Sequence, residues 1–151
     1  MIVNTGKEII ISSFIATFTA QFLKFSFYYI KNKKINFRIF ASTGEMPSSH
    51  SAAVIALTTS VGLIRGFESV EFAIALIFSL IVMYDAAGLR RSAGKMATQL
   101  NLLADAMWEH KPINCQEKLG ELLGHTPLEV TMGALLGAVV AFFYHFWMLA
   151  G

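Results

Sequence analysis

Hydrophobic residues along this chain are gathered into four long runs separated by polar segments, at residues 8–30, 51–64, 70–89 and 128–150. A helix needs about 17–25 mostly apolar residues to cross a bilayer. Each run therefore predicts a transmembrane helix, and the short second run reaches far enough if residues 48–51 are already helical. The pattern predicts an all-α, polytopic membrane helix bundle of about four transmembrane helices, with residues 1–151 as one domain.

Two of the three connections are polar and one is short. A basic loop covers residues 31–47, a short connection at 66–69 predicts an antiparallel helix hairpin, and a long polar stretch covers residues 90–127. In that stretch apolar residues recur at helical spacing, which predicts an amphipathic helix that rests on the membrane surface or caps the bundle. Its apolar residues are Leu100, Leu103, Ala104, Met107 and Trp108. A second short helix is expected at 117–123.

Composition agrees with a membrane protein, because 55% of the residues are hydrophobic and only 15% are charged. The single cysteine, Cys115, excludes an intramolecular disulfide and predicts a free thiol. The first run has Lys24 late in its length and no signal-peptide cleavage pattern after it, so we interpret it as a retained helix. The bilayer is the expected environment, and no nucleic-acid partner is expected.

The distribution of basic residues predicts the orientation. With four spans, the first and third connections share one side of the membrane, and the other side carries only Lys7 and Arg65. Short loops rich in Lys and Arg stay in the cytoplasm. We therefore expect a multi-pass protein of the cell membrane with both polar connections in the cytoplasm and both termini outside. The shared side carries Lys31, Lys33, Lys34, Arg38, Arg90, Arg91, Lys95, Lys111 and Lys118.

The first polar cluster, residues 42–51, leads into the second apolar run. Pro47 suits the first turn of a helix, and the free amides after it, together with the helix dipole, attract an anion. His50 can give or take a proton near neutral pH. The alternative is an ordinary helix cap. The groups expected to bind phosphate here are Thr43, Gly44, Ser48 and Ser49.

The second cluster, residues 84–95, lies where the third run ends. Arg90 and Arg91 can grip phosphate oxygens through their forked donors, with Lys95 in support. Asp85 can position an arginine, and a carboxylate at the apolar end of a helix needs a partner or a function. The alternative is a basic membrane border that only fixes topology.

The third cluster, residues 124–129, begins the last run. If that helix starts near Thr126, His125 and Glu129 are four residues apart, so the carboxylate can orient the imidazole as a nucleophile or base requires. Lys24 lies about two turns inside the first helix. It either extends to the membrane border or points into the bundle as another phosphate ligand. No role is predicted for His145.

Together these segments resemble the divergent PAP2 family. The resemblance rests on the runs TGEMPSSHSA at 43–52, YDAAGLRRSAGK at 84–95 and LGHTPLEV at 123–130, and AQFLK at 20–24 fits the same pattern. The wider PAP2 superfamily comprises phosphatidic-acid-type lipid phosphatases and vanadium haloperoxidases, which share a helical bundle and a metal-free phosphate or vanadate site.

The resemblance implies a role for each matching residue. Ser48 and the nearby amides would bind phosphate, His50 would protonate the leaving alcohol, and His125 would form a phosphohistidine. Glu129 stands where the superfamily usually has aspartate, and Ser49 replaces the glycine of its central motif.

Two further departures concern the basic residues. The superfamily places an arginine shortly before its nucleophilic histidine, whereas Arg90 and Arg91 precede His125 by more than thirty residues. Lys31 and Arg38 have the spacing of its first motif, but Ile39 replaces the motif's proline. Lys24 is therefore the preferred first ligand.

The expected function is hydrolysis of a lipid-linked phosphomonoester of the phosphatidate, phosphatidylglycerol phosphate or isoprenyl phosphate type, without a cofactor or metal. One alternative is a metal-dependent phosphotransferase that uses Asp85, Glu45 and Glu129, since hard cations favour carboxylates. Another is a lipid-phosphate-binding protein without turnover. Four helices form only a thin wall around a pocket, which favours a homodimer.

Overall fold

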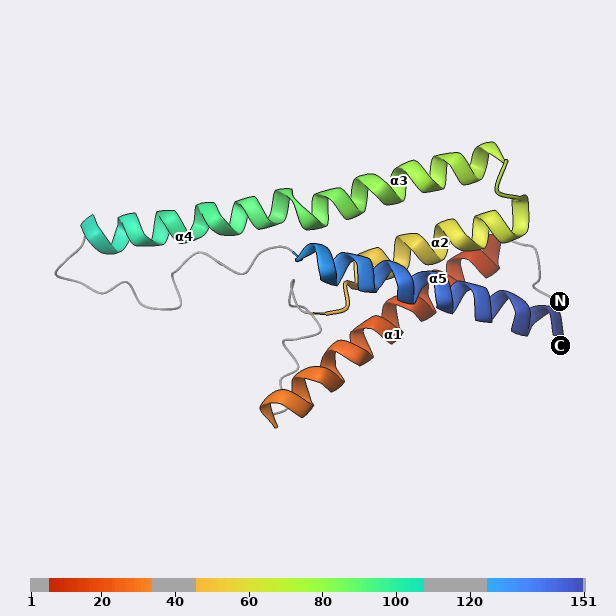
Figure 1. Ribbon diagram of the computed structural model, residues 1–151, viewed down its shortest axis with the longest axis horizontal. Helices are drawn as coiled ribbons and strands as arrows, with labels where there is room; N and C mark the ends of the chain where they lie inside the picture. Colours follow the sequence, from red (N-terminus) through yellow and green to blue (C-terminus); the bar gives the residue numbers. More distant parts are fainter. Residues whose placement is uncertain (1–5, 34–45, 108–124, 151) are drawn as a thin grey trace.

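The computed structural model describes residues 6–33, 46–107 and 125–150, which form five α-helices and no strand. The helices are α1 (Gly6–Asn32), α2 (Ser49–Arg65), α3 (Val70–Ala87), α4 (Leu89–Met107) and α5 (Pro127–Ala150). In Figure 1, α1, α2, α3 and α5 form a bundle, and the start of α1 and the end of α5 lie at the end that holds the α2–α3 connection. Helix α4 extends beyond the opposite end.

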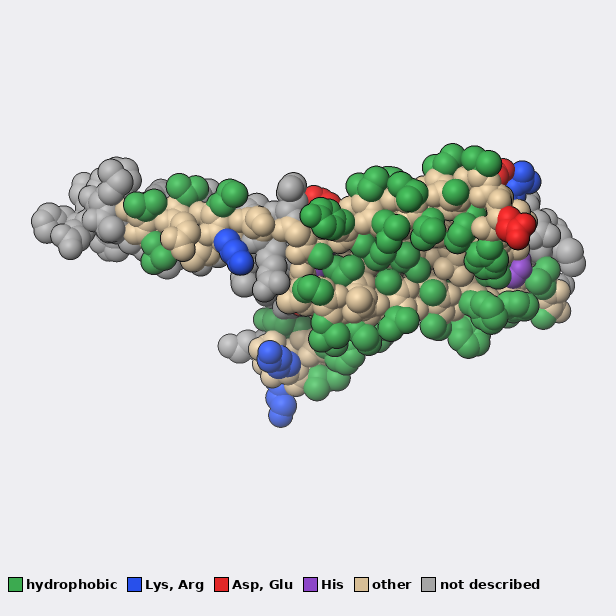
Figure 2. Space-filling model, turned by 45° about the horizontal axis from the view of Figure 1, so that its top comes forward, with side chains coloured by type: hydrophobic (Ala, Val, Ile, Leu, Met, Phe, Trp, Pro, Cys, Tyr) green, Lys and Arg blue, Asp and Glu red, His purple; other side chains and the backbone are tan. Residues whose placement is uncertain are grey.

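Helix α2 is the centre of the bundle, because it contacts α1, α3 and α5. Among the described residues, α1, α3 and α5 are long and apolar enough to cross a membrane, and α2 is slightly shorter at 17 residues. Large apolar side chains cover the outside of the bundle (Figure 2), whereas the buried positions hold mainly small or polar residues. This arrangement confirms the predicted all-α polytopic membrane bundle.

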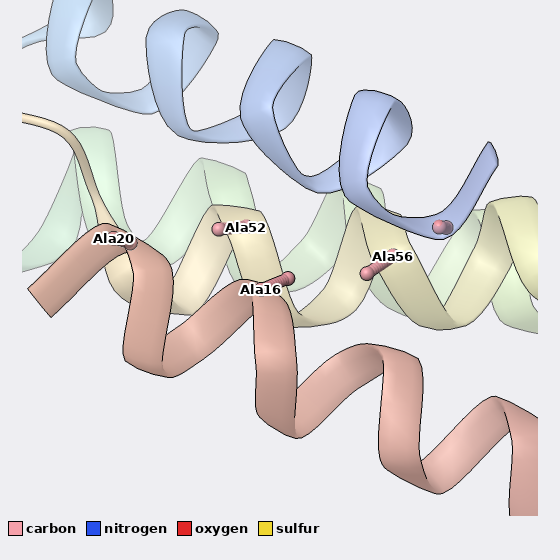
Figure 3. Packing of buried hydrophobic residues seen from close by; sticks show 5 residues of the cluster. Ala16, Ala20, Ala52 and Ala56 are labelled. Atoms are coloured by element: carbon pink, nitrogen blue, oxygen red, sulfur yellow. The ribbon is translucent and has the colours of Figure 1, made fainter. Parts of the chain in front are cut away.

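Small residues bring the helix backbones close together. The fully buried alanines Ala16, Ala20, Ala52 and Ala56 line the contact between α1 and α2 (Figure 3). On α5, a Cβ at Gly137 would collide with the backbone of Ala52. Lipid tails are as apolar as leucine, so helices in membranes associate through such close packing and through hydrogen bonds between them.

Buried polar side chains join three of the helix pairs that are in contact. Ser12 and Ser60 link α1 to α2 through hydroxyl groups 2.7 Å apart, and Thr58 links α2 to α3 in the same way. His145 Nδ1 lies 2.6 Å from Glu8 Oε1, which joins α5 to α1 near the chain ends. No pattern in the sequence predicts a role for His145, and the structure shows that it links the last helix to the first.

The predicted hairpin between α2 and α3 is confirmed. Gly66 has a φ of 92°, a conformation that favours glycine, and it ends α2. Ser69 caps α3 by accepting a hydrogen bond from the Phe72 N–H at 3.2 Å. Arg65 and Glu71 form a salt bridge of 2.8 Å across the turn. These short-range contacts fix the antiparallel arrangement.

The start of α2 differs in one respect from the prediction. The helix begins at Ser49, so the turn before residue 51 is helical as required. Pro47, however, lies one residue before the cap Ser48 and outside the first helical turn. The reason is that the Ser48 hydroxyl accepts a hydrogen bond from the Ser51 N–H and thereby takes the cap position.

The predicted amphipathic helix exists as α4, but it begins earlier, at Leu89. Among the described helices it contacts only α3, so the prediction that it caps the bundle is wrong. The physical reason is that Gly88 stays in a helical conformation, which keeps α4 close to the direction of α3. Trp108 and the helix expected at 117–123 lie outside the described residues.

Candidate functional site

The start of α5 is built as a capping box. The Glu129 N–H donates to Thr126 Oγ1 at 3.3 Å, and the Thr126 N–H donates to Glu129 Oε2 at 3.0 Å. Pro127 occupies the first helical position, where a missing N–H has no effect. The same carboxylate oxygen lies 3.1 Å from His125 Nδ1. The predicted helix start and the predicted His125–Glu129 contact are both confirmed.

His125 is held firmly in one orientation. It is only 3% exposed, and its backbone N–H donates to the carbonyl oxygen of Ala86 at 3.0 Å. When the neutral ring donates its Nδ1–H to Glu129, its lone pair is on Nε2. That arrangement gives a nucleophilic nitrogen whose direction is set by a carboxylate.

His50 lies beside His125, although the two residues are 75 positions apart in the sequence. Their ring centroids are 6.3 Å apart, and the rings are tilted by 57°. A backbone hydrogen bond of 3.0 Å from the Ser48 N–H to the Glu129 carbonyl joins the starts of α2 and α5. His50 is exposed, so its ring can reach a bound molecule.

The hydroxyl groups of Ser48 and Ser49, the two serines before His50, accept hydrogen bonds from other groups of the protein. Ser48 is 0% exposed and accepts hydrogen bonds from the N–H and the hydroxyl of Ser51. Ser49 is buried and accepts a hydrogen bond of 3.4 Å from Gln21 Nε2. The capping interpretation therefore accounts for the Ser48 hydroxyl, and phosphate binding by this segment stays a prediction.

Lys24 points into the bundle and is only 2% exposed, so the interpretation that it extends to the membrane border is wrong. A pocket of about 610 Å³ lies between α1, the start of α5 and the residues before α2. Both proposed first ligands, Lys24 and Lys31, line it, whereas Arg38 lies outside the described residues. The described residues that line it are Lys24, Phe27, Tyr28, Lys31, Asn32, Met46 and Glu129.

A backbone hydrogen bond connects the second cluster, residues 84–95, to His125. Arg90 and Arg91 are in the first turn of α4, one helical turn after Ala86, whose carbonyl binds the His125 N–H. The fold therefore places the backbone of Arg90 and Arg91 one helical turn from the residue that contacts His125, although more than thirty residues separate them from His125 in the sequence. Asp85 is half-buried in the last turn of α3.

Some predicted groups do not join this arrangement. Lys95 lies on the exposed surface of α4, where it lines a groove with Met96, Gln99 and Leu100. Thr43, Gly44 and Glu45 lie outside the described residues. In the part of the chain that the structure describes, no three His, Cys, Asp or Glu side chains are grouped to hold a metal ion.

Comparisons with known proteins agree with the sequence resemblance. The divergent PAP2 family matches residues 5–140. The chain is 42% identical over 149 residues to the uncharacterized membrane protein YuiD of Bacillus subtilis (strain 168), with 89% of this chain and 94% of that protein covered. No solved structure matches. The apolar helices and this relative together identify a membrane protein.

Proposed function

The chain belongs to the divergent PAP2 family, and from that premise we propose that it is an integral membrane phosphatase that hydrolyses a lipid-linked phosphomonoester. One observation carries the proposal. The buried His125 has Glu129 at its Nδ1, a second histidine beside it and a buried lysine in the adjoining pocket. A nucleophile, a proton donor and a cation are the three groups that transfer of a phosphoryl group to an imidazole requires.

The first step forms a phosphohistidine. His125 Nε2 attacks phosphorus, the bond from phosphorus to the alcohol oxygen breaks, and His50 gives its proton to that oxygen. Glu129 stabilises the positive charge that develops on the His125 ring. Lys24 lines the pocket, and the family resemblance implies that Arg90 and Arg91 join it at the equatorial phosphate oxygens. Electrostatic stabilisation there contributes most to such reactions.

The second step releases phosphate. Water attacks the phosphohistidine, His50 takes a proton from that water, and the bond from phosphorus to nitrogen breaks. The lipid alcohol and inorganic phosphate are the products, and both histidines return to their starting states. Neither step changes an oxidation state, and this route needs no group beyond the side chains named.

His50 has to turn outward during the first step. An attacking nitrogen lies about 3–3.5 Å from the reacting atom, and the proton donor needs a hydrogen bond of about 2.6–3.2 Å to the leaving oxygen on the opposite side. Together with the phosphorus–oxygen bond between them and the half-width of each ring, these distances exceed the 6.3 Å that separates the two ring centroids. Because His50 is exposed at the start of α2, rotation of its side chain can open this space.

The pocket lining supports a lipid substrate. Phe27, Tyr28 and Met46 offer apolar surface next to the two lysines. A phosphomonoester on a glycerol or isoprenyl chain presents the same combination, since its charged group adjoins an apolar body. Phosphatidate, phosphatidylglycerol phosphate and isoprenyl phosphates all fit this description. The basic connections favour the cytoplasmic face as the side on which the phosphate is bound.

The test is release of phosphate from a panel of these lipids by the purified protein in EDTA. We expect activity in the wild type and a loss of at least about 1000-fold in His125→Ala, as for removal of other catalytic nucleophiles. With an aryl phosphate, whose leaving group needs no proton, His50→Ala should still release the aryl alcohol in the first step but should release phosphate slowly, because the water of the second step has lost its base. Lys33→Ala is the control, because Lys33 is an exposed lysine that does not line the pocket. Unchanged activity in His125→Ala would refute the mechanism.

A lipid-phosphate-binding role without turnover is the second candidate. It is favoured by the full burial of the Ser48 hydroxyl, which serves the helix cap. This candidate predicts that vanadate and phosphate bind at the pocket and that Lys24→Met weakens their binding. It also predicts that no lipid of the panel is hydrolysed.

A further inference from the structure

The pocket beside Glu129 runs along one face of α1. Five residues of this helix line it at the spacing i, i+3, i+4, i+7 and i+8, which keeps them on a single stripe. They are Lys24, Phe27, Tyr28, Lys31 and Asn32. Figure 1 shows that α1 crosses the bundle obliquely and that its last turns lie away from α2 and α5. The pocket therefore extends along α1 from the inside of the bundle toward the end of the helix.

The two lysines lie at opposite ends of this face. They are seven residues apart, which is about 10 Å along the helix axis. Lys24 is only 2% exposed, whereas Lys31 is exposed in the last turn of α1. Because one side chain is buried and the other is exposed, the two lysines mark two positions for an anion instead of one shared position.

Uncharged surface separates these two positions. Phe27 and Tyr28 lie between the lysines on the same stripe. Aromatic rings offer apolar area to the carbon atoms of a ligand, and the tyrosine hydroxyl adds a hydrogen-bonding group. The Asn32 side chain donates to the Tyr28 carbonyl at 3.2 Å, so Lys31 is the pocket residue of this last turn that supplies positive charge. The face thus has the order cation, aromatic surface, cation.

The start of α5 decides which end of the pocket is reactive. Glu129 lines the pocket, and its Oε2 lies 3.1 Å from His125 Nδ1. The last turns of α1, which carry Lys31, lie away from α5 in Figure 1. Lys24 comes about two turns earlier and is buried. A phosphomonoester that reacts at His125 is therefore expected beside Lys24, which leaves Lys31 for a second anionic group.

The chemistry of the lipid head group distinguishes the substrate classes at these two positions. Phosphatidate and an isoprenyl monophosphate carry one phosphate group and can occupy only one of them. In an isoprenyl diphosphate the two phosphate groups share an oxygen atom, so no uncharged unit lies between them. In phosphatidylglycerol phosphate a glycerol unit separates a phosphodiester from a terminal phosphomonoester. That head group has the same order of charged and uncharged parts as the face of α1.

We propose that Lys31 forms a second anion subsite that binds a phosphodiester, and that the preferred substrate is a phospholipid whose glycerol head group ends in a phosphomonoester. The proposal rests on the proposed phosphatase function for the position of the phosphomonoester at Lys24. The exposed Lys31 contacts the phosphodiester at the level of the lipid head groups, where basic residues at helix ends lie. Lys31 thereby selects the lipid, and the two steps at His125 are unchanged.

Calorimetric titration of the full-length protein in detergent micelles tests the second subsite. His125→Ala is used so that no ligand is consumed. The ligands are short-chain phosphatidylglycerol phosphate, phosphatidate with the same acyl chains, and an isoprenyl diphosphate. We expect the first to bind at least about tenfold more tightly than the other two, since a hydrogen bond to a charged group contributes about that factor or more.

Two lysine substitutions in the same background separate the subsite from general charge attraction. Lys31→Met should abolish the preference for phosphatidylglycerol phosphate over phosphatidate. Lys33→Met is the matched control and should keep the preference, because Lys33 is an exposed lysine that does not line the pocket. The ratio of kcat/KM for the same two lipids, measured with Lys31→Met and Lys33→Met in otherwise wild-type protein, repeats the test without the change at His125.

The possible outcomes separate this proposal from the phosphatase itself. Equal Kd values for the two glycerol lipids, an unchanged preference in Lys31→Met, or tightest binding of the isoprenyl diphosphate would overturn the second subsite. Hydrolysis of the lipids without such a preference would remove the subsite and leave the phosphatase. A preference in binding that Lys31→Met abolishes, with no lipid hydrolysed by the wild type, would support the subsite and refute the phosphatase.

Discussion

The contact between α2 and α5 depends on the absence of a side chain at Gly137. In Gly137→Ala the new Cβ would lie 2.9 Å from the carbonyl carbon and 3.0 Å from the Cα of Ala52, and it would overlap the Ala52 carbonyl oxygen. Carbon atoms in good contact are about 3.5–4.0 Å apart. The obstructing atoms are all backbone, so no rotation of a side chain can relieve the overlap, and the two helices must separate locally.

The expected change in the free energy of unfolding is the difference between the cost of the poor contact and the gain in helix propensity. Overpacking in a filled core costs about 1–3 kcal/mol, and a radial gap of about 0.5–1 Å removes a quarter to a half of the attraction between the separated atoms. Alanine in a helix is favoured over glycine by about 0.8–1 kcal/mol. We therefore expect Gly137→Ala to lower the free energy of unfolding by about 1–2 kcal/mol, which corresponds to a Tm lower by about 2–8 °C.

The assay is reversible unfolding in mixed micelles, followed by circular dichroism. Gly6→Ala is the control, because it is the same chemical change at a helical position where a Cβ would meet nothing within 4 Å. That variant should be as stable as the wild type or slightly more stable. Equal stability of Gly137→Ala and Gly6→Ala would refute the reasoning that close backbone packing holds α2 against α5.

Three further changes probe other contacts. Glu129→Gln keeps an acceptor for the Thr126 N–H, so we expect a free energy of unfolding close to that of the wild type. Phosphate release should be at least about 100-fold slower, because His125 loses the carboxylate that orients it. Equal rates of phosphate release in this variant and the wild type would exclude that role of Glu129. His145→Leu removes the hydrogen bond between α5 and the buried Glu8 and should cost about 1.5–3 kcal/mol in the unfolding assay, whereas Glu8→Leu with His145→Leu should restore much of that loss. A double variant as unstable as the sum of the singles would contradict this. Lys24→Met should raise the Kd for vanadate by at least about tenfold, measured by calorimetry, and an unchanged Kd would remove Lys24 from the phosphate site.

Much of the fold could be predicted because the signals that specify it are local. Apolar runs place α1, α3 and α5, and the Thr126 cap followed by Glu129 predicts the start of α5 together with the His125 contact. The stripe of small residues that packs the bundle is also present in the sequence, since Gly133, Gly137 and Ala141 repeat every four residues. That spacing could have identified the α5 face that lies against α2.

Other features depend on contacts between distant parts of the chain. His145 finds Glu8 across 137 positions, and no local pattern around either residue indicates the partner. Arg90 departs from the superfamily order in the sequence, but it lies one helical turn after Ala86, whose carbonyl accepts the hydrogen bond from the His125 N–H. The course of α4 depends on Gly88 remaining helical, although glycine more often ends a helix.

The most direct test of the proposed phosphatase is capture of its intermediate. A lipid phosphomonoester carrying radioactive phosphate is mixed with the protein, and the reaction is quenched in alkali, in which phosphohistidine is stable. We predict a labelled peptide that contains His125, no label in His125→Ala, and release of the label by acid. Hydrolysis of the lipid without labelled protein, at the same rate in wild type and His125→Ala, would contradict it.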